Sequence, residues 1–114
     1  MTHLISAINV ACAKTTISGC YDGKEVTSIP HWEFFDLGIA VQTLCLKAHE
    51  LGLGTVVVGL MNHEACEKIL AVSEGHKVYA VIPIGRPATE PKAGPPRKPL
   101  SEIVFLNDLN KPMF

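Results

Sequence analysis

Two pairs of cysteine and histidine are spaced as metal ligands often are. Cys45 and His49 lie four residues apart, and His63 and Cys66 lie three apart, so each pair would share one face of a helix. Together they could bind zinc tetrahedrally. The stretch between the pairs reads as a strand that would carry them apart, and Cys45 flanks an apolar face where a free cysteine packs as a small hydrophobe. We therefore expect no metal, and no cysteine is marked as an activated nucleophile.

Glycines bracket the segment LGLGTVVVGL, residues 51–60. Phosphate-binding loops run from a strand through glycines into a helix, so that a helix N-terminus meets the anion. Gly52 and Gly54 follow a helix and precede a strand, so we interpret them as a helix C-cap and a tight turn. Gly59 differs, because it ends a strand just before a second helix. Its exposed N–H could meet a ligand, with an ordinary loop as the alternative.

A single adjacent basic pair, Arg97 and Lys98, lies within the sequence PPRKP. Flanking prolines stiffen the backbone, and an ordered Arg/Lys pair suits a phosphate group. The alternative is a solvated loop, which charge alone favours.

A helix is expected over residues 31–51, and it would help to position these candidate residues. Apolar residues recur along it at steps of three and four, which places them on one face: Phe34, Leu37, Val41, Leu44, Ala48 and Leu51. Ile39 and Leu46 widen the apolar surface, so we expect burial on more than one side. Pro30 suits the first turn, and Gly52 suits a left-handed cap.

The rest of the chain alternates short strands, turns and one more helix. Asn62 is a good N-cap for a helix over 63–70, and Asp22-Gly23 is a strong turn signal within the turn-rich stretch 18–30. Residues 3–13 are expected to form a strand, with a helix segment as the alternative. The remaining expected segments are strands over 55–58 and 77–85, a turn at 73–75, an extended proline-rich loop over 85–99, and a short strand or turn over 100–107. This mixture predicts an α+β fold.

Composition limits the classes of function. A chain of 114 residues with 47% hydrophobic and 18% charged residues is expected to be one domain, residues 1–114. Its net charge of −1, without a basic run, indicates neither a nucleic-acid partner nor a membrane surface. The four cysteines form no C-x-x-C pair and no signal-peptide pattern is present, so we expect reduced thiols and a cytoplasmic location.

Taken in order, these segments resemble the C-terminal part of the FMN-dependent nitroreductase family. The resemblance rests on DLGIA at 36–40, the Q-x-L-x-L-x-A stretch at 42–48, GLGT at 52–55 with Gly59, IGRP at 84–87, and PRK at 96–98; GCYDGK at 19–24 resembles a turn of one branch. It covers about residues 4–105 and implies a mostly antiparallel central sheet flanked by helices.

The resemblance also implies a site. In the family, backbone after the GLGT strand lies beside the flavin, so Val58, Gly59 and Leu60 would bond its N5 and carbonyl edge through main-chain groups. Arg97 and Lys98 would reach the FMN phosphate, and the long helix would form a homodimer interface. The implied reaction is ping-pong hydride transfer from NAD(P)H to a nitroaromatic or quinone-like acceptor. The flavin carries that chemistry, so no side chain is assigned as a general acid or base.

The family's N-terminal region, with an Arg-x-Ser-type motif that grips phosphate and ribityl chain, has no counterpart here. We therefore expect an incomplete domain: a truncated natural form, a fragment, or a chain completed by another subunit. The second hypothesis is a non-catalytic homodimeric flavin-binding or interaction module derived from the same fold.

Overall fold

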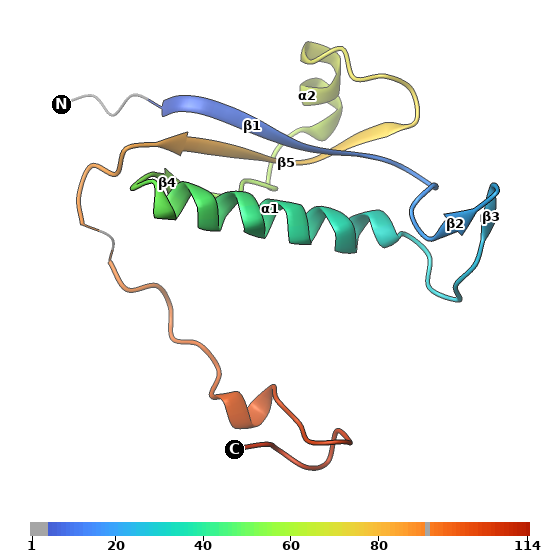
Figure 1. Ribbon diagram of the computed structural model, residues 1–114. Helices are drawn as coiled ribbons and strands as arrows, with labels where there is room; N and C mark the ends of the chain where they lie inside the picture. Colours follow the sequence, from blue (N-terminus) through green and yellow to red (C-terminus); the bar gives the residue numbers. More distant parts are fainter. Residues whose placement is uncertain (1–4, 91) are drawn as a thin grey trace.

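A computed structural model describes residues 5–90 and 92–114 of the chain (Figure 1). Its elements, in chain order, are β1 (Ile5–Lys14), β2 (Cys20–Tyr21), β3 (Lys24–Glu25), α1 (Trp32–Glu50), β4 (Gly54–Thr55), α2 (His63–Ile69), β5 (His76–Gly85) and the 3-10 turn η1 (Leu100–Glu102). The α+β class is confirmed.

The sheet is built on the two long strands. β5 is central, with β1 antiparallel on one side and the short β4 antiparallel on the other. Among the described residues β1 pairs only with β5, so its other edge is open. The expected strand over 3–13 is confirmed as β1, except that residues 3 and 4 lie outside the described residues.

Helices cover both faces of this sheet. α1 lies along one face and α2 on the other (Figure 1). The buried centre is small: Ala11, Ala80 and Ile82 form it, and Ile82 is 1% exposed. Residues of α1 that pack against it are Leu37, Val41, Leu44 and Cys45. Cys45 therefore packs as the small hydrophobe that its position on the helix predicted.

The ends of α1 show one correct and one wrong prediction. Gly52 has a φ of 73°, its N–H donates to the His49 carbonyl at 2.9 Å, and the Leu53 N–H donates to the Ala48 carbonyl at 2.9 Å. This is the expected left-handed cap. Pro30, however, lies outside the first turn, because His31 takes a left-handed φ of 62° that helical backbone cannot continue. The helix therefore begins at Trp32.

The strand expected over 55–58 is interrupted. β4 covers only Gly54–Thr55, and Val58 then forms an isolated bridge with Val81 in the same register. That register would place Val56 opposite Pro83. Pro83 lies two residues from Val81 along β5, so its backbone nitrogen faces the same segment, residues 54–58, as that of Val81. Proline has no N–H to donate, so the ladder fails there.

Local turn and cap signals agree with the structure. The side chain of Asn62 accepts a hydrogen bond from the Ala65 N–H at 2.9 Å, so the predicted N-cap is confirmed. Asp22 and Gly23 both have positive φ and join β2 to β3. Gly75, with a φ of 77°, lies in the expected turn before β5.

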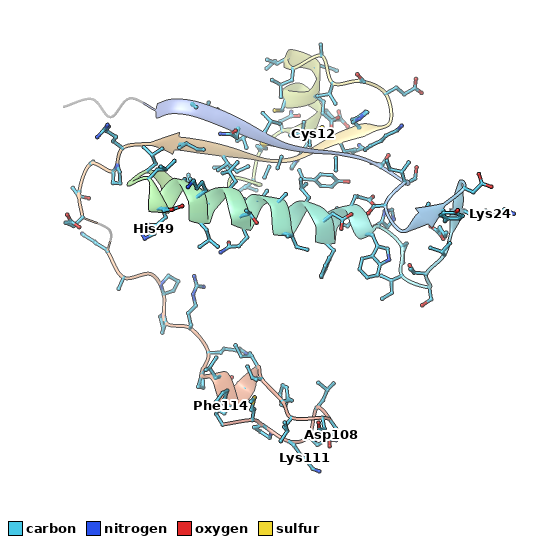
Figure 2. The ribbon with its side chains drawn as sticks, in the orientation of Figure 1. Cys12, Lys24, His49, Asp108, Lys111 and Phe114 are labelled. Atoms are coloured by element: carbon cyan, nitrogen blue, oxygen red, sulfur yellow. The ribbon has the colours of Figure 1, made fainter. Side chains whose placement is uncertain are left out.

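The C-terminal segment, residues 86–114, stands away from the sheet and α1 (Figure 1). In its described residues, η1 is followed by a bridge between Phe105 and Pro112. Of the strand or turn expected over 100–107, the structure shows a 3-10 turn. Figure 2 shows Asp108, Lys111 and Phe114 gathered at its far end. Most of its large apolar side chains are exposed, including Ile103 at 55% and Leu109 at 81%.

Candidate functional site

Between β4 and α2, the main-chain groups of Val58 are hydrogen-bonded, whereas the N–H groups of the next two residues have no partner among the described residues. Val58 exchanges both of its main-chain hydrogen bonds with Val81, at 2.9 and 3.0 Å, so its N–H is committed to the sheet. The next two residues differ. Among the described residues, none accepts a hydrogen bond from the N–H of Gly59 or of Leu60. Leu60 is 99% exposed, so this stretch presents two free donors on the surface.

Among the residues that the structure describes, none would clash with a side chain at position 59. Its φ lies outside the left-handed region, and a Cβ built there would meet the Tyr79 carbonyl oxygen at 3.9 Å, an ordinary contact distance. Gly19 contrasts with it, because a Cβ there would meet the Trp32 ring at 2.4 Å. A glycine without a side chain leaves the backbone at this exposed position open to close approach.

Two side chains of α2 hold the backbone behind this segment. The strand register skips Tyr79, since Ala11 pairs with Ala80 and Cys12 with Val78, which makes a β-bulge in β5. Next to the bulge, the Val78 N–H donates to Glu67 Oε1 at 3.0 Å, and the Val78 carbonyl lies 2.9 Å from His63 Nδ1. His63 Nε2 lies 3.0 Å from the Gly59 carbonyl. Spacing alone had marked His63 only as a candidate zinc ligand.

The basic pair lies apart from Gly59 within one chain. Residues 92–99 lead away from the end of β5 toward η1 (Figure 1). Lys98 Nζ is 3.7 Å from Glu102 Oε2, an exposed pair of small energetic value, and Arg97 is exposed. A single copy therefore does not bring Arg97 and Lys98 to the Gly59 segment.

The outward face of α1 carries an apolar groove of about 530 Å³. Its lining residues are Phe34, Phe35, Gly38, Ile39, Gln42 and Thr43. Phe34, Phe35 and Ile39 are 55%, 62% and 56% exposed. A Cβ at Gly38 would meet nothing within 4 Å in the described part of the chain, so no packing contact there accounts for a glycine that weakens the helix. Together with this exposure, the open space at Gly38 suits the close packing of another surface.

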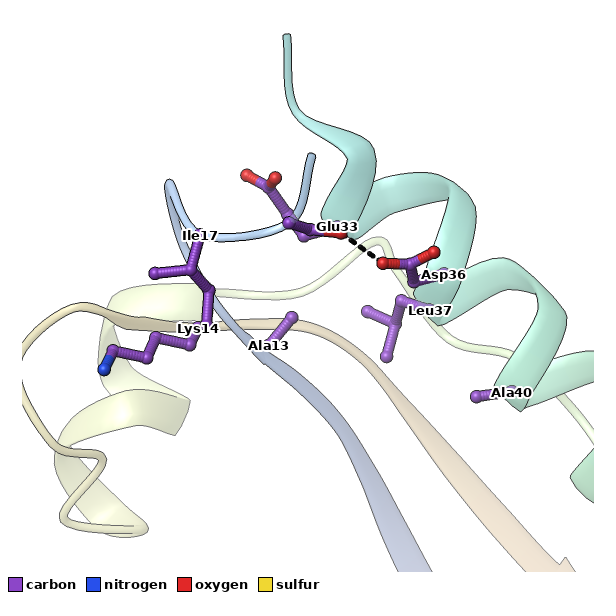
Figure 3. A pocket seen from close by; sticks show the side chains of 8 residues that line it. Ala13, Lys14, Ile17, Glu33, Asp36, Leu37 and Ala40 are labelled. Atoms are coloured by element: carbon purple, nitrogen blue, oxygen red, sulfur yellow. Dashed lines mark hydrogen bonds between the residues drawn. The ribbon is translucent and has the colours of Figure 1, made fainter. Parts of the chain in front are cut away.

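A second cavity, of about 390 Å³, lies where the end of β1 meets the start of α1 (Figure 3). Its polar residues are Lys14, Ser18, Glu33 and Asp36, and the Ser18 hydroxyl donates to the Asp36 carboxylate. Glu33 is 3% exposed and its Oε1 lies 3.0 Å from His31 Nδ1. This hydrogen bond is the main cause of a lowered pKa of Glu33. These contacts tie the helix start to the preceding loop, which is a structural role.

The two cysteine and histidine pairs lie on different helices: Cys45 and His49 on α1, and His63 and Cys66 on α2, on the other face of the sheet (Figure 1). All four cysteines are free thiols. Figure 2 shows Cys12 on β1 and His49 at the C-terminal end of α1. Desolvation, with a smaller contribution from Glu67, raises the pKa of Cys12, the opposite of an activated thiolate. Within residues 5–90 and 92–114, no three His, Cys, Asp or Glu side chains gather as metal ligands would.

The helices of this same part of the chain also include none with the length and apolar character needed to cross a membrane.

Comparison with known proteins gives this site a context. Residues 4–86 match the family model described as the nitroreductase family. A protein of Methanothermobacter thermautotrophicus, named provisionally as an NADH dehydrogenase/NAD(P)H nitroreductase, is 34% identical over 83 residues, which are 69% of this chain and 43% of that protein.

Solved structures agree at the level of the fold. A nitroreductase family protein from Clostridium novyi NT is 24% identical with a TM-score of 0.57, over 93% of this chain and 53% of its own. An oxidoreductase described as containing FMN is 20% identical with a TM-score of 0.72, over 91% of this chain and 56% of its own. The chain thus spans about half the length of the relatives it matches.

Proposed function

This chain belongs to the nitroreductase family, and we propose that it forms part of an FMN-dependent oxidoreductase. The proposed reaction passes hydride from NAD(P)H to a nitroaromatic or quinone-like acceptor in a ping-pong sequence. Activity, substrates and cofactor are proposals for this chain, because it spans about half of each relative.

The observation that carries the proposal is the free main chain at Gly59 and Leu60. A flavin ring offers N5 and carbonyl acceptors along one edge, and two unpaired N–H groups beside a glycine suit that edge. Val58 would keep its place next to the ring. Because its N–H is bonded to Val81, we assign the donors to Gly59 and Leu60 instead.

The residues of this chain would bind and orient the cofactor. FMN, when bound, supplies hydride acceptance and donation at N5. Gly59 and Leu60 would fix the edge of the ring, while Arg97 and Lys98 would neutralise the phosphate. No side chain is assigned a proton-transfer role.

A second copy of the chain would complete the site. Gly59 and Leu60 lie on an open surface, and the basic pair lies at the base of a segment that stands away from its own body. The groove on α1 is apolar, exposed and open at Gly38. We therefore propose a homodimer in which α1 pairs with its copy and Arg97 and Lys98 reach the partner's flavin.

Flavin titration tests the proposal. The purified chain should bind FMN with a shift of its visible absorbance, and Gly59→Ala should weaken binding of both FMN and riboflavin. The same substitution should leave thermal unfolding nearly unchanged, because a Cβ at position 59 has room in the fold. A wild-type chain that binds neither flavin would contradict the proposal. That result would favour the alternative, a non-catalytic homodimeric module.

A further inference from the structure

His63 touches two carbonyl groups that belong to different parts of the chain. Its Nδ1 lies 2.9 Å from the Val78 oxygen in β5, and its Nε2 lies 3.0 Å from the Gly59 oxygen. Carbonyl oxygens only accept, so a ring N–H is the donor in each hydrogen bond that His63 makes here. The imidazole therefore links the bulged part of β5 to the segment that precedes α2.

The link has a geometrical consequence for Leu60. The Gly59 carbonyl and the Leu60 N–H belong to one peptide unit, which is planar and trans, so the two groups point in opposite directions. With the carbonyl held toward His63, the Leu60 N–H is directed away from the protein body. Leu60 is 99% exposed, so that N–H faces open space.

The contact of His63 with Gly59 can be tested separately from its contact with Val78, because Glu67 makes a contact with Val78 alone. Glu67 lies one helical turn beyond His63 and binds the Val78 N–H at 3.0 Å. Both side chains therefore satisfy main-chain groups next to the bulge. Only His63 also reaches Gly59.

We infer that His63 is a positioning residue: it fixes the Gly59–Leu60 peptide so that the Leu60 N–H is presented outward as a ready-made donor. As far as the donor serves a flavin ring, the inference rests on the proposed function. The orientation of the peptide itself does not depend on any ligand.

The test compares His63→Ala with Glu67→Ala in the full chain. Each variant removes one contact to Val78, but only His63→Ala releases the Gly59 carbonyl. In ¹⁵N relaxation measurements, His63→Ala should lower the order parameter of the Leu60 amide from about 0.85 to below about 0.6. Glu67→Ala should leave that amide ordered. Equal effects of the two variants, or an ordered Leu60 amide in His63→Ala, would overturn the inference.

Flavin binding gives the second measurement. His63→Ala should weaken FMN and riboflavin by the same factor, about tenfold, because the lost donor faces the ring and not the phosphate. If the wild type binds no flavin, the proposed function fails while the relaxation measurement still decides the role of His63. If His63→Ala does not fold, His63→Gln replaces it: the amide keeps a donor of similar reach, so Leu60 should be more ordered than in a chain carrying His63→Ser. Equal Leu60 order in those two variants would also overturn the inference.

Discussion

Arg97 offers the sharpest test at the scale of single residues. A charge-assisted hydrogen bond to a phosphate contributes about 1.5–3 kcal/mol. Arg97→Ala should therefore weaken FMN binding by about tenfold to a hundredfold. Riboflavin, which lacks the phosphate, should bind nearly as before. Titration of both flavins into wild type and variant measures the difference.

Lys92→Ala is a matched control, because it removes a cation from the same proline-rich segment outside the PRK motif. It should change FMN affinity much less than Arg97→Ala. An equal loss for FMN and riboflavin in Arg97→Ala would mean that the residue acts on folding or on the ring.

Glu33 should make stability depend on pH in the acid range. Its pKa is lowered chiefly by the hydrogen bond with His31, so the folded state favours the ionised carboxylate. That stabilisation is present above the unfolded-state pKa of about 4.3 and is lost as the pH falls through the lower folded-state value. Urea unfolding between pH 6 and pH 3 should show a fall in wild type that Glu33→Gln reduces. An unchanged slope in the variant would contradict this assignment.

Single residues also show where sequence reasoning stops. The Asn62 cap and the Gly52 cap were predictable because each acts within a few residues of itself. His63 was considered only as a zinc ligand and rejected, so its contacts were not predicted. Its partners are the carbonyls of Val78 and Gly59, which only the folded sheet brings together. Gly59 was a candidate from its place between a strand and a helix, whereas Val58 and Leu60 came only from family resemblance. The hydrogen bond of the Val58 N–H to Val81 was invisible in the sequence.

At the scale of elements, the long segments were predictable and their interruptions were not. α1 and β5 carry clear apolar periodicity over many residues, and both were expected within one residue at each end. The break in β4 depends on Pro83, more than 25 positions along the chain from Val56. A β-branched run favours a strand locally, but a strand needs donors from its neighbour.

The glycine within α1 gives an element-scale prediction with two opposite effects. Gly38→Ala should stabilise an isolated chain by about 0.5–1 kcal/mol, because alanine is the better helix former and has room here. If a second helix packs against this groove, the added methyl group should weaken association. Unfolding of dilute protein and sedimentation at several concentrations measure the two effects.

Ala40→Ser serves as the control, because it adds one atom to α1 at a residue lining the other cavity. It should leave association unchanged. Gly38→Ala without any effect on association would argue against close packing at this groove.

At the scale of the whole molecule, the chain is too extended for its length. Its radius of gyration is 18.1 Å, whereas a compact chain of this size has about 13 Å. The difference reflects the C-terminal segment, which stands away from the sheet with most of its large apolar side chains exposed. The proline content of residues 85–99 predicted an extended loop, but the separation of everything beyond it could not be read from local patterns.

We expect self-association to bury this exposed apolar surface. We predict a homodimer that buries at least roughly 2,000 Å², as obligate interfaces do. Light scattering at micromolar concentration should give about twice the mass of one chain. A monomer under those conditions would contradict the prediction and the proposed completion of the site by a second copy.

The open edge of β1 should affect the solubility and the yield of the chain. Ten residues of extended backbone pair with β5 on one side only among the described residues. A long strand edge of this kind is a template onto which any other extended chain can add. We therefore expect newly made or overproduced chains to aggregate edge to edge through this strand until another chain or segment covers it. Yield and solubility will then depend on how fast that edge is covered.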